Sequence, residues 1–137
     1  MICIISVIEK GDILGEKIKD ILGGDLILKS KIKNFKLDSI TKKCFEKYNS
    51  IIFISSTGIA VRAVSKYLVS KDKDPAVVVV DVCNKFSISL VSGHLGGANN
   101  LTLRVSEILG NIPVITTGTD NMDIVAPDII AMNNKLI

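Results

Sequence analysis

The sequence has no tryptophan, one histidine, three cysteines and only 4% aromatic residues. So few aromatic side chains cannot form a base-stacking surface, and a net charge of +3 is far from the dense positive charge of a nucleic-acid-binding domain. The cysteines are odd in number and widely spaced, which argues against a disulfide framework and against a Cys-x-x-Cys metal site. We therefore expect no nucleic-acid partner, no metal site, and buried reduced thiols at Cys3, Cys44 and Cys83 in a cytoplasmic protein.

Long apolar runs are also lacking. The apolar start at residues 2–8 is too short to cross a bilayer, has no basic lead-in, and runs directly into a polar stretch. We therefore expect no membrane span and no export signal. Isoleucine, valine and leucine are plentiful, and a hydrophobic content of 47% over 137 residues is enough for the core of one ordinary domain.

Apolar runs alternate with amphipathic segments along the chain. Runs typical of buried strands occur at residues 2–8, 25–28, 50–55, 76–80, 86–91 and 112–116. Helical spacing is found at residues 13–22, 38–48, 59–69 and from about 98 to 110. In the first of these helices, the positions predicted to face inward are Ile13, Leu14, Ile18, Ile21 and Leu22.

This alternation predicts an α/β fold, a three-layer sandwich with a mainly parallel sheet and helices on both faces. The link at residues 81–85 is too short for a parallel crossover, so the strands on either side of it are predicted to form one antiparallel hairpin. Residues 1–120 are predicted to form the α/β domain. Residues 121–137 are predicted to be a tail, with helical potential around residues 123–132.

The stretch at residues 92–100, Ser-Gly-His-Leu-Gly-Gly-Ala-Asn-Asn, lies between a predicted strand and a predicted helix. A helix that begins in such a loop has free backbone N–H groups, which favour an anion or a developing oxyanion. His94 has an ordinary pKa of about 6.5 and can exchange protons near neutrality. The loop is equipped to bind a carboxylate or phosphate and to move a proton. An ordinary glycine-rich turn is the alternative.

Two further loops follow predicted strands, at residues 55–58 and 116–120. Simple helix capping by Ser or Thr, worth about 1 kcal/mol, is one reading of the first loop. Arg62 near that helix start favours a nearby anion instead. If the strands at 50–55, 86–91 and 112–116 point the same way, all three loops meet in one cleft beyond their carboxyl ends. Such a cleft would suit the hydrolysis or isomerisation of an acidic substrate.

Four ordered segments, at residues 56–62, 71–81, 92–99 and 113–120, resemble the amino-terminal part of the CbiG family of cobalamin biosynthesis proteins. The resemblance implies a cobalt-precorrin-5A hydrolase of the anaerobic pathway, which opens the δ-lactone of a cobalt corrinoid and releases acetaldehyde. It also implies that cobalt arrives with the substrate, so no protein cofactor is expected. Members of the family are usually more than twice this long, so we expect an amino-terminal fragment that lacks a carboxyl-terminal domain; a homodimer is left open.

Opening a lactone needs an activated water, a stabilised oxyanion and a proton for the departing oxygen. We expect His94 to be the base, and Asp120 to orient His94 or to act as a second proton shuttle. Backbone N–H groups of Gly96 and Gly97 would hold the oxyanion or a peripheral carboxylate, whereas Arg62, Ser56 and Thr57 would clamp acetate or propionate arms. The other predicted substrate-binding residues are Gly58, Ser92, Gly93, Asn99, Thr116 and Thr117.

Three other functions are left open. The domain could bind a corrinoid or another acidic ligand without catalysis, while the missing carboxyl-terminal domain carries the chemistry. It could be a nucleotide-binding α/β domain, although both phosphate-binding fingerprints are absent from the sequence. It could also be a purely structural subunit.

Overall fold

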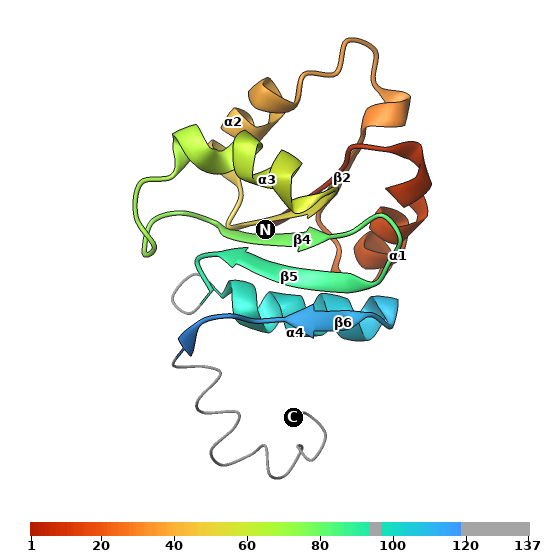
Figure 1. The fold of residues 1–137 in the computed structure, drawn as a ribbon. Coiled ribbons are helices and arrows are strands. Elements are labelled where there is room, and N and C mark those ends of the chain that lie inside the picture. Colours follow the sequence, from red (N-terminus) through yellow and green to blue (C-terminus); the bar gives the residue numbers. More distant parts are fainter. Residues whose placement is uncertain (94–96, 119–137) are drawn as a thin grey trace.

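A computed structural model describes residues 1–93 and 97–118 of this chain. Within those residues a six-stranded sheet has the order β2-β1-β3-β4-β5-β6 (Figure 1). The strands are β1 (Ile2–Ser6), β2 (Asp25–Leu28), β3 (Ser50–Ile54), β4 (Ala76–Val80), β5 (Phe86–Val91) and β6 (Ile112–Val114). The α-helices are α1 (Asp12–Leu22), α2 (Leu37–Lys47), α3 (Thr57–Val64) and α4 (Ala98–Leu109), and short 3₁₀ turns lie at η1 (Glu9–Gly11), η2 (Lys29–Lys31) and η3 (Ser65–Tyr67).

The sheet is mainly parallel. β1 pairs in parallel with β2 and β3, and β3 pairs in parallel with β4. β5 is antiparallel to β4, and β6 is parallel to β5. The predicted α/β class, the mainly parallel sheet and the single antiparallel pair are confirmed. It also follows that β5 and β6 run opposite to β3.

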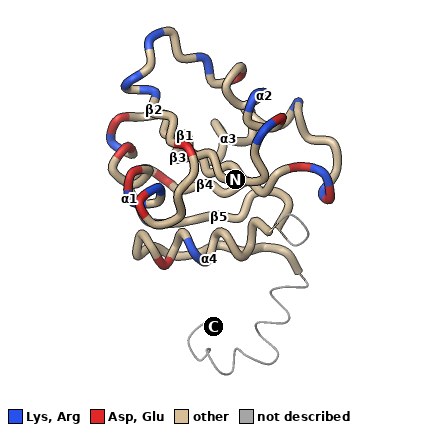
Figure 2. The backbone as a smooth tube through the Cα atoms, turned by 180° about the vertical axis from the view of Figure 1, so that it is seen from behind, with Lys and Arg blue, Asp and Glu red and all other residues tan. Residues whose placement is uncertain are grey.

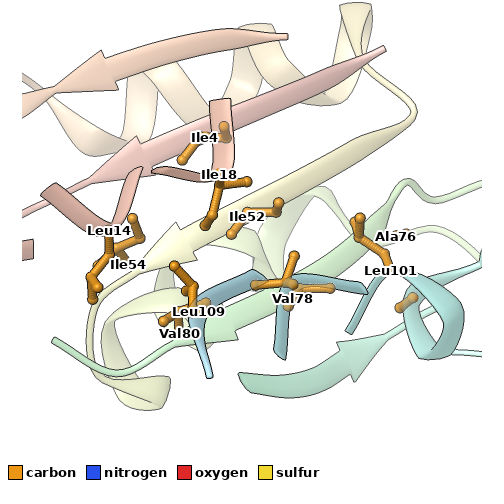
Figure 3. Close-up of a cluster of buried hydrophobic side chains, with 12 residues drawn as sticks. Ile4, Leu14, Ile18, Ile52, Ile54, Ala76, Val78, Val80, Leu101 and Leu109 are labelled. Atoms are coloured by element: carbon orange, nitrogen blue, oxygen red, sulfur yellow. The ribbon is translucent and has the colours of Figure 1, made fainter. Parts of the chain in front are cut away.

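Helices cover the sheet on both faces. Alternate strand residues such as Ile52 and Val78 face α1 and α4 (Figure 3), and their neighbours Phe53 and Val79 face α2 and α3. Every residue of β4 is buried, which explains its unbroken run of small apolar side chains. Two apolar layers therefore hold the three-layer sandwich together, one on each face of the sheet.

Helix α1 differs in part from its prediction. Leu14 and Ile18 are buried as expected, but Ile13 and Ile21 are 58% and 63% exposed, so their predicted inward positions are wrong. The helix instead turns Gly15 toward the sheet, where a Cβ atom would lie only 2.8 Å from Leu26 Cδ1. Because successive helical residues are about 100° apart, turning position 15 inward moves positions 13 and 21 toward solvent.

Three element boundaries fall short of the predicted ones. β1 ends at Ser6, and β6 ends at Val114. Helix α3 ends at Val64 and continues as the 3₁₀ turn η3, so the predicted helix to residue 69 is too long. The tail at residues 121–137 and its predicted helix lie outside the described residues.

Two of the three cysteines are buried as expected. The Sγ atoms of Cys3 and Cys44 are 3.2 Å apart, between β1 and α2. Their shared hydrogen bond raises the pKa of the Cys3 thiol and lowers that of Cys44. Cys83 is exposed in the tight β4–β5 connection, so its predicted burial is wrong.

None of the helices in residues 1–93 and 97–118 combines the length and the apolar character that a bilayer crossing requires. Over the same two ranges, no group of three or more His, Cys, Asp or Glu side chains is placed to hold a metal ion.

Candidate functional site

Of the three loops predicted to share one cleft, the one at residues 55–58 lies at the opposite end of the sheet from the loops that follow β5 and β6. Residues 55–58 follow β3, whose end lies beside Val80 at the end of β4. In the antiparallel β4–β5 pair, Val80 lies opposite Ser87, and Val77 lies opposite Val91 at the end of β5. The loop after β5 therefore lies near the start of β3 and β4, about 13–17 Å away along a five-residue strand. The prediction of one shared cleft is wrong, because β5 runs against β3.

The loop before α3 is a helix start with exposed polar groups. Ser55 is 1% exposed, and its hydroxyl donates to the backbone oxygen of Ser56 at 2.8 Å. The Ser56 hydroxyl accepts the backbone N–H of Ile59 at 3.3 Å, so Ser56 caps the helix. Thr57 and Gly58 are exposed in the first turn. The capping role is confirmed, and it uses the Ser56 hydroxyl.

Arg62 lies over the same turn. A Cβ atom added to Gly58 would lie 3.4 Å from Nη1 of Arg62, so the guanidinium folds back toward the start of α3. The structure thus brings together the predicted residues Ser56, Thr57, Gly58 and Arg62. Of these four, Arg62 lines a hollow of about 430 Å³ between α2 and α3, whose other lining residues are Leu37, Asp38, Ile59, Ala63 and Lys66.

The only carboxylate that lines this hollow is already paired. Asp38 accepts the hydroxyl of Tyr67 at 2.6 Å and forms an ion pair with Lys66 at 3.1 Å. The Tyr67 hydroxyl, followed by the Lys66 ammonium, lowers the pKa of Asp38. The same hydrogen bond raises the pKa of Tyr67. These contacts fix one wall of the hollow.

The loop before α4 is closed by its own backbone. Ser92 has a φ of 61° and Gly97 a φ of 87°, both in the left-handed region. The N–H of Ala98 donates to the Ser92 oxygen and the N–H of Asn99 donates to the Gly93 oxygen, each at 3.0 Å. Two N–H groups of the first turn of α4 are therefore taken up inside the loop. These two N–H groups are not those of Gly96 and Gly97, whose predicted contact with an oxyanion stays a prediction.

Asn99 connects this loop to the sheet. Its side chain is 7% exposed, accepts the Ser89 hydroxyl at 2.6 Å, and donates to the Thr117 hydroxyl at 2.9 Å. A Cβ atom on Gly93 would lie 2.7 Å from Asn99 Oδ1 and 3.1 Å from Thr117 Cγ2, so only glycine fits there. The structure brings together the predicted residues Ser92, Gly93, Asn99 and Thr117.

Ser89 was missed from the sequence. The alternation of residues in β5 could have pointed to it, because Ser87 and Ser89 face α4 while Ile88 points to the other side of the sheet. Two small hydroxyl residues on the helix-facing side of a strand are unusual for a simple apolar core, and here each holds a polar partner: Ser89 bonds to Asn99, and Ser87 bonds to Asn111.

Three predicted site residues, His94, Gly96 and Asp120, lie outside the described residues. Gly93 and Gly97, on either side of residues 94–96, both lie at the end of the sheet where α4 begins. Thr116 is exposed beyond β6.

The strand order and the two loops define the class of protein. The order β2-β1-β3-β4 reverses direction between β1 and β3, as in doubly wound α/β domains that bind ligands beyond the carboxyl ends of their strands. A loop of small residues connects β3 to α3, and another connects β5 to α4. The chain is a doubly wound α/β domain.

The chain belongs to the family described as Cobalamin synthesis G N-terminal, whose sequence model matches residues 39–120. It is 48% identical over 90 residues to the cobalt-precorrin-5A hydrolase of Salmonella typhimurium, a match that covers 66% of this chain and 26% of that protein. It is 49% identical over 76 residues to the cobalt-precorrin-5A hydrolase of Priestia megaterium, covering 56% of this chain and 20% of that protein.

The fold is also that of a solved relative. The crystal structure of a protein described as a cobalamin biosynthesis protein G homolog from Sulfolobus solfataricus matches with a TM-score of 0.67 and 29% sequence identity. The match covers 97% of this chain and 44% of that chain. The matches thus cover less than half the length of each of these relatives.

Proposed function

We propose that this chain is the amino-terminal domain of a cobalt-precorrin-5A hydrolase that acts in cobalamin biosynthesis. Membership of the family and 48–49% identity to two proteins of that name support the proposal. In the proposed reaction, water opens the δ-lactone of a cobalt corrinoid and acetaldehyde is released. The cobalt enters with the substrate, and the protein supplies acid, base and oxyanion contacts.

The observation that carries this proposal is the anchoring of the loop before α4. Asn99 is held by Ser89 and Thr117, and the carbonyl oxygens of Ser92 and Gly93 are held by the start of α4. The described residues on both sides of position 94 are therefore fixed by buried hydrogen bonds. Such fixed placement is what lets a catalytic group act at hydrogen-bond range on a bound substrate.

The proposed chemistry follows from the residue types. Neutral His94 accepts a proton from water, which attacks the lactone carbonyl carbon; the ring C–O bond breaks, and a proton is returned to the departing oxygen. Acetaldehyde then leaves when the freed hydroxyl group loses its proton and the C–C bond to the macrocycle breaks, with the electron pair and a proton passing to the macrocycle. Backbone N–H groups of Gly96 and Gly97 stabilise the oxyanion. Asp120 orients His94 or serves as a second proton shuttle.

The group around Arg62 has a separate part in the proposal. It lies at the other end of the sheet from the described residues that flank position 94, Gly93 and Gly97. Ser56, Thr57, Gly58 and Arg62 are therefore proposed as a second contact for acidic groups, outside the reacting centre.

The test is turnover by the complete protein that contains this chain. We expect His94→Ala to lower acetaldehyde release by about a hundredfold or more, because a general base contributes that much. Arg104→Gln is a matched control, because Arg104 is exposed on α4 and takes no part in the anchoring contacts. Unchanged turnover in His94→Ala would remove His94 from the mechanism.

A second assay separates catalysis from binding. If the carboxyl-terminal part of the complete protein releases acetaldehyde without residues 1–118, the chemistry lies elsewhere. The present domain would then be a non-catalytic module that binds a corrinoid or another acidic ligand.

A further inference from the structure

The hollow between α2 and α3 has an excess of positive charge. Its single carboxylate, on Asp38, is neutralised by Lys66 at 3.1 Å. The Arg62 guanidinium forms no hydrogen bond or ion pair with any other residue of 1–93 and 97–118. One cation thus remains uncompensated at the hollow among the described residues.

Lysines outnumber acidic residues around the hollow, where Glu46 lies close enough to raise the pKa of Tyr67. Lys42 is close enough to lower the pKa of Asp38, after the larger effects of Tyr67 and Lys66. The connection from β2 to α2 carries Lys29, Lys31, Lys33 and Lys36, all exposed, and has no acidic residue. Figure 2 shows several blue Lys or Arg positions along the outer loop that leads into α2. Such a field raises the local concentration of anions.

The rest of the hollow is apolar. Leu37 and Ala63 line it together with Ile59, which is 38% exposed, so apolar surface faces solvent beside the guanidinium. The hollow has a volume of about 430 Å³ and is open to solvent, so a small organic ligand would be only partly enclosed there. An apolar wall next to a single unpaired cation suits a singly charged anion with an apolar body better than an inorganic polyanion.

We infer that this hollow is a binding site for an organic carboxylate with a compact apolar body. The planar guanidinium of Arg62 receives the carboxylate through two parallel hydrogen bonds. Ile59, Leu37 and Ala63 contact the apolar body. This inference rests on the second acidic contact proposed above for Arg62 and narrows its ligand class; its test does not depend on hydrolysis of a corrinoid.

Octanoate is the probe that tests this site on the full chain of 137 residues. We expect saturable binding by calorimetry, with methyl resonances of Ile59 and Ala63 shifting in NMR spectra. Arg62→Gln should weaken binding roughly tenfold or more, because a charge-assisted bidentate contact is lost. Arg62→Lys keeps the charge but loses the planar guanidinium, so its affinity for octanoate should lie between those of the wild type and Arg62→Gln.

The chain has two arginines, and the second supplies the matched control. Arg104→Gln, on α4, should leave octanoate binding unchanged. Ile59→Glu places a negative charge on the apolar wall and should abolish binding, and circular dichroism would show that both Arg62→Gln and Ile59→Glu are folded.

Three results would overturn the inference. Octanoate shifts that do not saturate, or that persist unchanged in Arg62→Gln, would exclude a carboxylate site at Arg62. Octanol binding as tightly as octanoate would show that only the apolar surface binds. Inorganic phosphate competing with octanoate at equal concentration would show that the hollow recognises charge alone. None of these readouts depends on turnover, so the proposed hydrolase can fail or succeed separately.

Discussion

The loop before α3 and the loop before α4 have similar compositions but different environments. Both connect a strand to a helix through serine and glycine residues. In the α3 loop, Thr57 and Gly58 are exposed, and Ser56 makes one long capping bond of 3.3 Å. In the α4 loop, Asn99 is buried and holds partners at 2.6 and 2.9 Å. The first loop presents polar groups to solvent, whereas the second uses them to fix its own shape.

A loop of serine and glycine residues between a strand and a helix can therefore serve two roles: it can present polar groups to solvent, or it can use them to fix its own shape. Buried, mutually bonded polar groups are costly to disturb because each lost partner leaves a desolvated group. Exposed groups exchange protein partners for water at little cost. We therefore expect substitutions in the α4 loop to affect stability strongly, and substitutions in the α3 loop to affect it weakly.

The largest effect is expected for Asn99→Leu. This change removes the acceptor of the buried Ser89 hydroxyl and the donor to Thr117, so the free energy of unfolding should fall by about 2–3 kcal/mol. Unfolding by denaturant measures this change in the free energy of unfolding. Asn100→Leu, at the exposed neighbouring position, should change the value by no more than about 0.5 kcal/mol. Equal effects of the two substitutions would contradict the buried network.

A glycine pair sharpens the comparison directly. Gly93→Ala should cost about 1–3 kcal/mol, because the new Cβ would lie 2.7 Å from Asn99 Oδ1. Gly58→Ala should be neutral or stabilise by about 0.5–1 kcal/mol, because the neighbour at 3.4 Å is the end of the Arg62 side chain and alanine favours the helix. Thermal unfolding of both variants would test the opposite signs.

A smaller effect is expected at the cap of α3. Ser56→Ala should lower the free energy of unfolding by about 1 kcal/mol, because the N–H of Ile59 loses its acceptor. Ser56→Gly should cost only a few tenths of a kcal/mol. If alanine and glycine behaved alike, the capping bond would not be the cause.

The smallest effect should depend on pH. The Tyr67 hydroxyl and Lys66 lower the pKa of Asp38 below its ordinary value of 3.8. The folded state therefore favours the ionised carboxylate, and this contribution is present above pH 3.8 and is lost as the pH falls through the lower folded pKa. Wild type should melt slightly above Asp38→Asn at pH 7, and the two should converge in acid. Asp20→Asn, on the exposed surface of α1, is the matched control.

The direction of β5 could have been predicted from the sequence. The short link at residues 81–85 predicts the antiparallel hairpin, and the helical crossover between β3 and β4 predicts that these two strands are parallel. Together these two predictions already place the ends of β3 and β5 at opposite ends of the sheet. The prediction of one shared cleft did not combine them.

Other features needed the packed structure. The exposure of Ile13 and Ile21 depends on which side of α1 approaches the sheet, and Gly15 decides that through its contact with Leu26. The pairing of Asn99 with Ser89 depends on the register of β5 under α4. Neither is encoded in a local pattern. The roles of His94 and Asp120 stay predictions, because both residues lie outside the described part of the chain.

The exposure of Cys83 has a practical consequence. Cys3 and Cys44 are buried, so a maleimide dye should attach at Cys83 alone without any engineered substitution. That position, 3.7 Å from Lys10 Nζ, lies beyond the end of β4, at the same end of the sheet as the start of α3. A fluorophore there would report on ligands arriving at that end of the molecule and would leave the end at which α4 begins unlabelled.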